Sequence, residues 1–172
     1  SGAFGLWLAP VSGGNATQVF AFEAGASISI SSDYWALTPD GSAVVILYQV
    51  NNDSRLYSAP LNGTNAQGTR LNVGATATGV IRNFRISPNG ATVAFVHGSG
   101  TPYNLYAAPI AGPGSATVKL TSTGHYDDRD LAGAEFASQG TRIVYLDNPD
   151  IWSAKVDGSD KILLAAGTPG GY

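Results

Sequence analysis

The densest group of chemically active side chains lies in the segment 125–130, His-Tyr-Asp-Asp-Arg-Asp. Carboxylate oxygens are the ligands that calcium prefers, so Asp127, Asp128 and Asp130 are a candidate calcium site. Their spacing does not match the EF-hand loop, and Arg129 stands among them, which favours a solvated loop or an ion-pair network. We therefore expect no bound cofactor, with calcium as the alternative.

Residues suited to catalysis are scarce. The chain has no cysteine, and its two histidines, His97 and His125, are separate from each other with no third nitrogen or sulfur ligand, which disfavours zinc. No Gly-x-Ser-x-Gly turn occurs, and Gly98-Ser99-Gly100 follows a predicted strand without leading into a helix. The sequence therefore predicts that this chain is not an enzyme.

The elements that position these residues are predicted to be β-strands. No window of a dozen residues shows a 3.6-residue period free of Gly or Pro, and the 22 glycines favour many tight turns. The net charge of −3 gives no footprint for nucleic acid. No apolar run approaches the roughly 20 residues that span a bilayer.

Composition also bears on origin. Few lysines, no sulfur-containing residues and many small polar residues are typical of an exported bacterial protein, periplasmic or extracellular. Because methionine is absent even at position 1, we expect a processed form or a piece of a longer chain.

The sequence contains an internal repeat. Four segments align without gaps, each with an aliphatic residue, an aromatic residue, an alanine two places on and a closing glycine. They are 6–13, 56–63, 105–112 and 151–158, with starts 50, 49 and 46 residues apart. Period-two alternation that closes on glycine indicates a strand ending in a turn.

Two further motifs recur between these segments. A four-residue turn ends at Gly41, Gly90 and Gly140, and an apolar strand starts three residues later. Proline pre-sets φ and glycine accepts positive φ, so we expect tight hairpins at the first two and a looser turn at the third, which lacks proline. Short segments of edge-strand character follow each Gly-ended strand. They begin at Gln18, Arg70, Lys119 and Lys161.

Each repeat is thus predicted to be a four-stranded antiparallel sheet, ordered as inner strand, second strand, Leu-Tyr strand and outer strand. Such sheets stack as the blades of a β-propeller. The Ser/Thr-Pro-Asp/Asn-Gly turn and the Leu-Tyr-x-x-Pro-x-x-Gly strand resemble the blade repeat of TolB-like propellers. The resemblance implies an all-β propeller fold and leaves function open, because scaffolds, receptors and enzyme gating domains use this repeat.

The repeats divide the chain into about three and a half blades: a half blade at 1–25 and blades at roughly 26–74, 75–123 and 124–172. Closed propellers usually have about 4–8 blades, so we expect a partial or open ring. It would be completed by further blades of a longer chain, by a second copy in a homo-oligomer, or by a protein partner packed against the open array.

The inner strands align apolar positions that we expect to form the core between blades. These are Trp35, Phe84 and Ala134 in one set, and Leu37, Ile86 and Phe136 in the other. Arg85 and Glu135 alternate with them and are expected to pair across adjacent blades. Because propeller ligands bind near the inner strands, the residues preceding them form a candidate binding surface. It comprises Asp33, Tyr34, Arg82, Asn83, His125, Tyr126 and Arg129.

Three functions fit these patterns. The first is a non-catalytic protein-binding or scaffold module of an exported bacterial protein. The second is the propeller portion of a larger serine peptidase or other hydrolase, where it controls substrate access. The third is an accessory structural subunit of a multiprotein or filamentous extracellular assembly.

Overall fold

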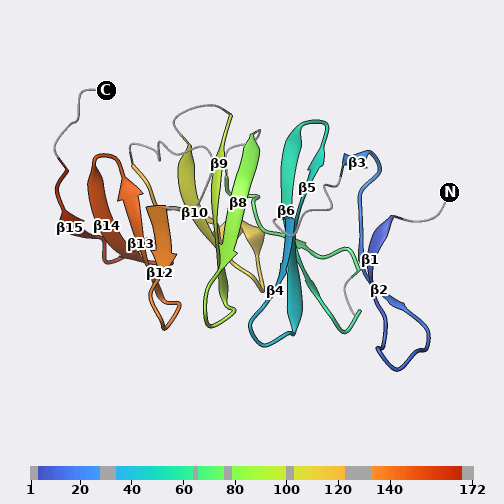
Figure 1. Ribbon diagram of the computed structural model, residues 1–172. Helices are drawn as coiled ribbons and strands as arrows, with labels where there is room; N and C mark the ends of the chain where they lie inside the picture. Colours follow the sequence, from blue (N-terminus) through green and yellow to red (C-terminus); the bar gives the residue numbers. More distant parts are fainter. Residues whose placement is uncertain are drawn as a thin grey trace.

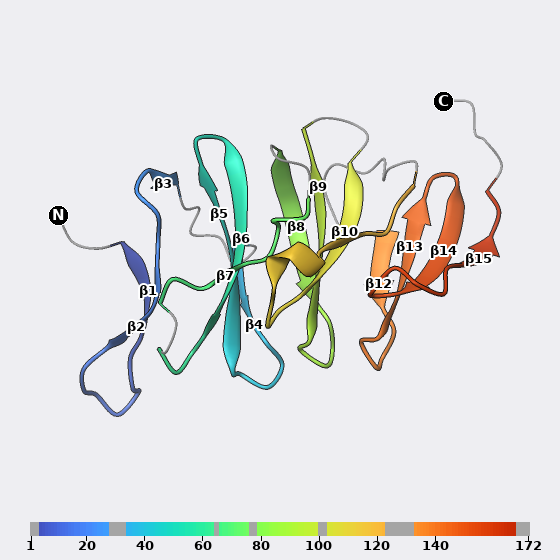
Figure 2. The ribbon, with the colours of Figure 1, turned by 180° about the vertical axis from the view of Figure 1, so that it is seen from behind.

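The computed structural model describes residues 4–27, 34–63, 66–75, 79–99, 103–122 and 133–167. These residues form four antiparallel sheets that follow one another in chain order (Figure 1). From behind, the hairpin β1–β2 lies at one end of the row and β15 at the other (Figure 2). The predicted all-β fold of stacked propeller blades in an open ring is confirmed.

The first two sheets have different numbers of strands. The first is a hairpin of β1 (Gly5–Leu8) and β2 (Thr17–Ala21). The second has the order β3-β5-β6-β7, and β4 also pairs with β5. Its strands are β3 (Ala26–Ser27), β4 (Trp35–Leu37), β5 (Ala43–Val50), β6 (Asp53–Pro60) and β7 (Thr69–Arg70).

The third and fourth sheets each have four strands in simple sequence order. The third consists of β8 (Val80–Ile86), β9 (Thr92–Gly98), β10 (Asn104–Pro109) and β11 (Val118–Lys119), with the 3-10 helix η2 (Gly114–Ala116) before β11. The fourth consists of β12 (Ala134–Phe136), β13 (Arg142–Asp147), β14 (Asp150–Lys155) and β15 (Ile162–Ala165). No helix in the described ranges is long and apolar enough to cross a membrane.

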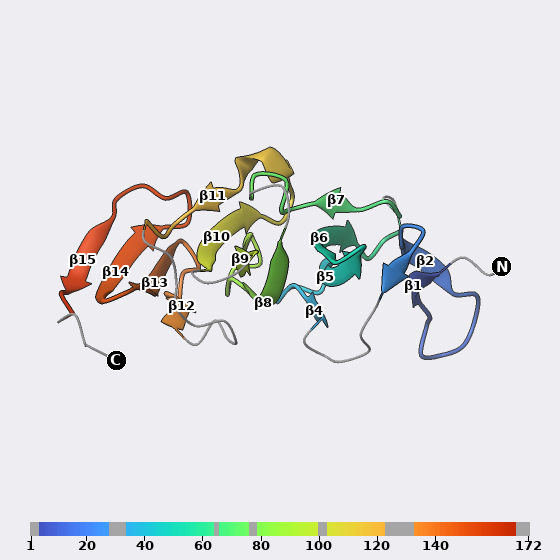
Figure 3. The same cartoon turned by 90° about the horizontal axis from the view of Figure 1, so that it is seen from above.

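In the second, third and fourth sheets, the second and third strands pair in the same register. This register shows which residues of neighbouring blades are equivalent. The pairs Val44–Ala59, Val93–Ala108 and Ile143–Ala154 are equivalent between second strand and third strand. From above, the inner strands β4, β8 and β12 lie along one side of the arc, and the outer strands β7 and β11 lie along the other (Figure 3). Any residue can therefore be compared with its counterpart in a neighbouring blade.

The inner hairpins close on glycines with positive φ: 68° at Gly41, 70° at Gly90 and 68° at Gly140. In the first, Asp40 Oδ1 accepts a hydrogen bond from Thr38 Oγ1 at 2.6 Å, which with the Ser42 contacts lowers the pKa of Asp40 to about 2. The prediction of a looser third turn is wrong. The Gly140 amide donates to the Ala137 carbonyl at 2.8 Å, as the Gly41 amide does to Thr38. Main-chain bonds and glycine set this turn, and proline is dispensable.

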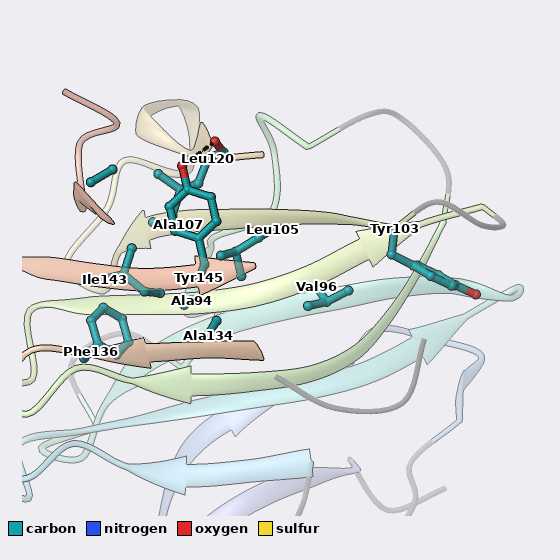
Figure 4. Close-up of a cluster of buried hydrophobic side chains, with 11 residues drawn as sticks. Ala94, Val96, Tyr103, Leu105, Ala107, Leu120, Ala134, Phe136, Ile143 and Tyr145 are labelled. Atoms are coloured by element: carbon teal, nitrogen blue, oxygen red, sulfur yellow. Dashed lines mark hydrogen bonds between the residues drawn. The ribbon is translucent and has the colours of Figure 1, made fainter. Parts of the chain in front are cut away.

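Three hydrophobic clusters lie between successive sheets and hold the blades together. Phe20, Ile46 and Tyr48 join the first and second sheets, while Val45, Leu47 and Phe95 join the second and third. The cluster between the third and fourth sheets includes Ala94, Val96, Leu105, Phe136, Ile143 and Tyr145 (Figure 4). Faces of adjacent sheets thus bury one another, as stacked repeats require.

The predicted inter-blade core of the inner strands is only partly right. Ala134 and Phe136 are 4% and 8% exposed, and Phe84 packs against the cluster between the second and third sheets. Trp35 and Leu37, however, are 47% and 50% exposed. The sheet beside them contains, among the described residues, only β1 and β2, the counterparts of a third and an outer strand. In the part of the chain that the structure describes, no second strand of a preceding sheet covers this position.

Candidate binding surfaces

Three residues of the predicted binding surface lie in the described ranges. Tyr34 packs against the core between the second and third sheets. Arg82, on β8, donates from Nη2 to the Tyr103 hydroxyl at 3.2 Å, and its guanidinium lies 5.7 Å from the centre of that ring. Asn83 Oδ1 accepts a hydrogen bond from the Phe84 amide at 2.7 Å. The structure therefore joins Arg82 to Tyr103, a residue that the sequence did not single out.

The other predicted site residues lie outside the described ranges. They are Asp33, His125, Tyr126 and Arg129 of the surface, and Asp127, Asp128 and Asp130 of the calcium candidate. The calcium site therefore stays a prediction. Within the described ranges, no group of three or more His, Asp or Glu residues is placed to hold a metal ion.

A set of buried polar residues at one repeat position was not predicted from the sequence. Tyr48, His97 and Asp147 each lie four residues after the first apolar residue of the second strand, and each is almost completely buried. Their chemical types differ, so no motif marks them. Each faces the preceding blade, where a buried polar group must find a partner or lose its hydration without compensation.

Two members of this set form hydrogen bonds with residues at the end of the preceding blade. The Tyr48 hydroxyl donates to Glu23 Oε1, just beyond β2, at 3.1 Å. Burial raises the pKa of Tyr48, so the hydroxyl stays protonated and remains a donor. Asp147 Oδ2 accepts from both the amide and the hydroxyl of Ser122, just beyond β11, at 2.7 and 2.6 Å. The same repeat position thus links blades through different chemistry.

The third member, His97, is held differently. Its ring meets the Tyr106 ring edge-on at 6.0 Å between centres, and its Nδ1 is buried without a hydrogen-bond partner. Burial lowers the pKa of His97; Asp53 opposes this effect and Arg70 adds to it. The neutral imidazole is therefore the form that suits the folded state.

A charged network lies where the first and second sheets meet. Arg55 pairs with Asp53, and its Nε lies 3.9 Å from Glu23 Oε2. Arg70 Nη2 lies 3.6 Å from Asp53 Oδ2. The Tyr57 hydroxyl donates to Glu23 Oε1 at 3.0 Å. These groups neutralise one another, and the arrangement is suited to joining blades rather than to activating a substrate.

An open groove lies at the turn side of the second and third sheets, where Thr38, Ser42 and Ile110 contribute to its lining. The hydroxyls of Thr38 and Ser42 both donate to Asp40 Oδ1 within the turn. The Ser58 hydroxyl donates to the Ile110 carbonyl at 2.6 Å. These polar groups therefore serve the fold.

Two exposed apolar surfaces stand out, one on the second sheet and one on the fourth. The first, which we call the β4 face, consists of Trp35 and Leu37. The second, the β14 face, consists of Val144, Ile151 and Ile162, of which the first two are 36% and 42% exposed. Val144 and Ile162 flank Ser153 in one cross-strand row, so they share a face of the sheet.

Counterparts of the β14 face are buried wherever another blade follows. Ala94 and Leu105 occupy the positions of Val144 and Ile151 one blade earlier, and both are about 1% exposed beneath the fourth sheet. The β14 face therefore occupies the repeat position that packs between blades earlier in the chain. Its apolar character is a property of that repeat position.

No protein-family model matches the chain, and no curated protein matches it. Solved structures do resemble it. TolB from Acinetobacter baumannii is 19% identical with a TM-score of 0.50 over 92% of this chain and 37% of that one. Putative TolB from Agrobacterium tumefaciens is 19% identical with a TM-score of 0.51 over 77% and 46%. The AtxE2 isopeptidase is 14% identical with a TM-score of 0.51 over 80% and 29%.

These likenesses confirm the TolB-like propeller fold predicted from the repeats. The chain spans less than half the length of each of these three structures. Two of these proteins are named TolB and the third is an isopeptidase, so the shared fold does not select a function.

Proposed function

We propose that this chain is a non-catalytic protein-binding or scaffold module of an exported bacterial protein, built from TolB-like propeller blades. The observation that carries the proposal is the pair of exposed apolar surfaces, the β4 face and the β14 face. Their repeat positions pack between adjacent blades elsewhere in the chain, where the residues are either buried or, at Phe84 and Ile86, partly buried.

Covering these faces with protein is energetically favourable. Apolar surface removed from water contributes about 25 cal/mol per Å², and Trp35, Leu37 and Ile151 each leave 42% or more of their surface exposed. The faces are also shaped by the same strand geometry as the internal interfaces, so a complementary sheet would find matching positions. Polypeptide is therefore the ligand class that we assign to them.

Site-specific photo-crosslinking in the producing cell tests this function. A photoreactive amino acid placed at Trp35 or Ile162 is expected to crosslink to polypeptide identified by mass spectrometry. The matched control is Ser115, which is exposed on η2 and belongs to neither face. Crosslinks at neither face, or equal crosslinking from Ser115, would contradict the proposal.

A second candidate function is the propeller portion of a larger hydrolase. The likeness to the AtxE2 isopeptidase supports it, because the matched region is 29% of that enzyme's chain. The complete reading frame around this sequence tests it. A flanking segment with a Gly-x-Ser-x-Gly turn between a strand and a helix is the expected result, and flanks made only of further blade repeats would contradict it.

A further inference from the structure

We propose that His97 makes the junction between the second and third sheets acid-sensitive, so that a proton taken up by its ring favours opening of this junction while the junctions on either side stay closed. The junction lies in the interior of the row of sheets (Figure 1). The inference goes beyond the proposed function, because it concerns how two blades separate and holds whichever partner binds.

The imidazole ring is enclosed by main chain and by an aromatic ring. His97, on β9, is 1% exposed. One side of the ring lies against Gly79, where a Cβ atom would lie 2.9 Å from both Cε1 and Nε2, and the ring forms a hydrogen bond with the Gly79 main chain. Tyr106 meets the ring edge-on at 6.0 Å between centres. A side chain at position 79 would displace the ring, so glycine there permits its burial.

The nitrogen that would take up the proton is buried without an acceptor. In the part of the chain that the structure describes, Nδ1 of His97 has no hydrogen-bond partner. A proton there would add a buried charge and a buried donor, and neither would be compensated. Both penalties disappear when the junction opens and water reaches the ring, so protonation favours the opened state.

The charges that act on the ring come from the second sheet. Asp53 on β6 attracts an imidazolium, and Arg70 on β7 repels it. The attraction is weakened because Asp53 already pairs with two arginines of its own sheet. On the third sheet, Tyr106 of β10 lies beside the ring, and Ile81 of β8 is its cross-strand partner. Burial is the strongest influence on the pKa of His97 and lowers it, so the closed junction favours the neutral ring.

The same end of the junction carries hydrogen bonds that join the two sheets. The amide of Ser54, on β6, donates to the Gly79 carbonyl at 3.1 Å, and its hydroxyl accepts from the Ile81 amide at 2.9 Å. His97 therefore contacts the residue through which the second sheet holds the start of the third. A ring that moves to hydrate its proton must leave Gly79, so the Ser54 and Ile81 amides are the groups that report the opening.

The equivalent positions at the two other junctions carry groups that do not titrate near neutral pH. Burial raises the pKa of Tyr48, which takes its titration further from neutrality. Asp147 accepts two hydrogen bonds from Ser122, and aspartates ordinarily titrate at about pH 3.9. Of these three side-chain types, only imidazole ordinarily changes its charge between pH 5 and 8. Acid sensitivity in that interval is therefore expected at one junction.

Amide hydrogen exchange resolved by NMR and corrected for the intrinsic effect of pH tests the proposal. Protection of the Ser54 and Ile81 amides is expected to fall by about tenfold between pH 7.5 and 5.5, the limit for one group with an ordinary pKa of about 6.5 that stays neutral in the closed state. The Ser122 amide, which donates to Asp147 at the next junction, is expected to keep its protection. In His97→Gln, protection of the two reporter amides is expected to stay constant, whereas the matched control His125→Gln keeps the native pH dependence.

Constant protection of Ser54 and Ile81 in the native chain would overturn the proposal. An equal fall at Ser122 would also overturn it, because acid would then loosen more than one junction. Titration of the His97 ring resonances in the native chain gives a second measurement that needs no variant to fold: a midpoint below pH 6.5 is expected, and one at or above it would refute the switch. None of these results bears on crosslinks at Trp35 or Ile162, which test the proposed function alone.

Discussion

The inner strands β4 and β12 occupy the same position in their repeats and have opposite surroundings. Phe136 on β12 is 8% exposed, and its counterpart Leu37 on β4 is 50% exposed. Both side chains are large and apolar, and both strands pair with their second strands in the same register. The difference comes from the neighbouring sheet alone, so burial in this fold is decided by the preceding blade.

Truncating Phe136 and Leu37 is expected to produce the largest difference in stability between the two strands. Phe136→Ala leaves a cavity beneath the third sheet and is expected to lower the free energy of unfolding by about 3 kcal/mol. Leu37→Ala removes a half-solvated group and is expected to cost less than about 1 kcal/mol. Urea unfolding monitored by circular dichroism measures both. Equal losses would show that β4 is covered in solution.

The comparison also explains how far the sequence predicts the fold. The turn ending in Gly41 and Gly90 and the Leu-Tyr strand recur at nearly constant spacing, which predicts the blades and the order of their strands. The same alignment placed Trp35 and Leu37 in the core, because aligned positions carry similar residues whatever lies beside them. The solvent exposure of an inner-strand residue depends on whether a preceding blade covers it, and the local sequence pattern does not contain that information.

The polar residues between blades show a second limit. Tyr48, His97 and Asp147 share one repeat position and are all buried, yet they have no chemical type in common. A motif search needs recurring residues, and here only burial recurs. The Arg85–Glu135 pair was predictable because two opposite charges appear at aligned positions, and the structure confirms it: Arg85 pairs with Glu135 and donates to the Ala134 carbonyl at 2.9 Å.

Two carboxylates that link neighbouring sheets also differ in burial: Asp147 at the junction of the third and fourth sheets, and Glu23 at the junction of the first and second. Asp147 is buried and accepts two hydrogen bonds from Ser122, so Asp147→Asn is expected to lower stability by about 2 kcal/mol. Glu23, at the junction with the first sheet, is largely solvated, and Glu23→Gln is expected to cost about 0.5 kcal/mol. Thermal and urea unfolding of both variants measure the difference. A larger loss for Glu23→Gln would reverse the assignment of the tighter junction.

The buried His97 is expected to make the stability of the protein depend on pH. Its folded pKa lies below the ordinary 6.5, so the unfolded chain takes up the proton first as pH falls. The stabilisation is fully present above pH 6.5 and is lost below it, with a slope of at most about 1.4 kcal/mol per pH unit. Urea midpoints between pH 7.5 and 5.5 should fall in the native chain and in His125→Gln, and stay flatter in His97→Gln. An unchanged slope in His97→Gln would refute the role of this histidine.

The smallest effect expected is at the ion pair between the inner strands of the third and fourth sheets. Arg85 and Glu135 are both substantially solvated, so their mutual coupling is expected to be about 0.5 kcal/mol. A double-mutant cycle of Arg85→Ala and Glu135→Ala isolates the coupling from the bond that Arg85 donates to the Ala134 carbonyl. The coupling should shrink in 1 M salt, where screening extends over only about 3 Å, while the backbone bond persists. A coupling above about 2 kcal/mol would mean that this pair is desolvated, and that the blade following the third sheet is held by charge as well as by the apolar contacts of Phe136.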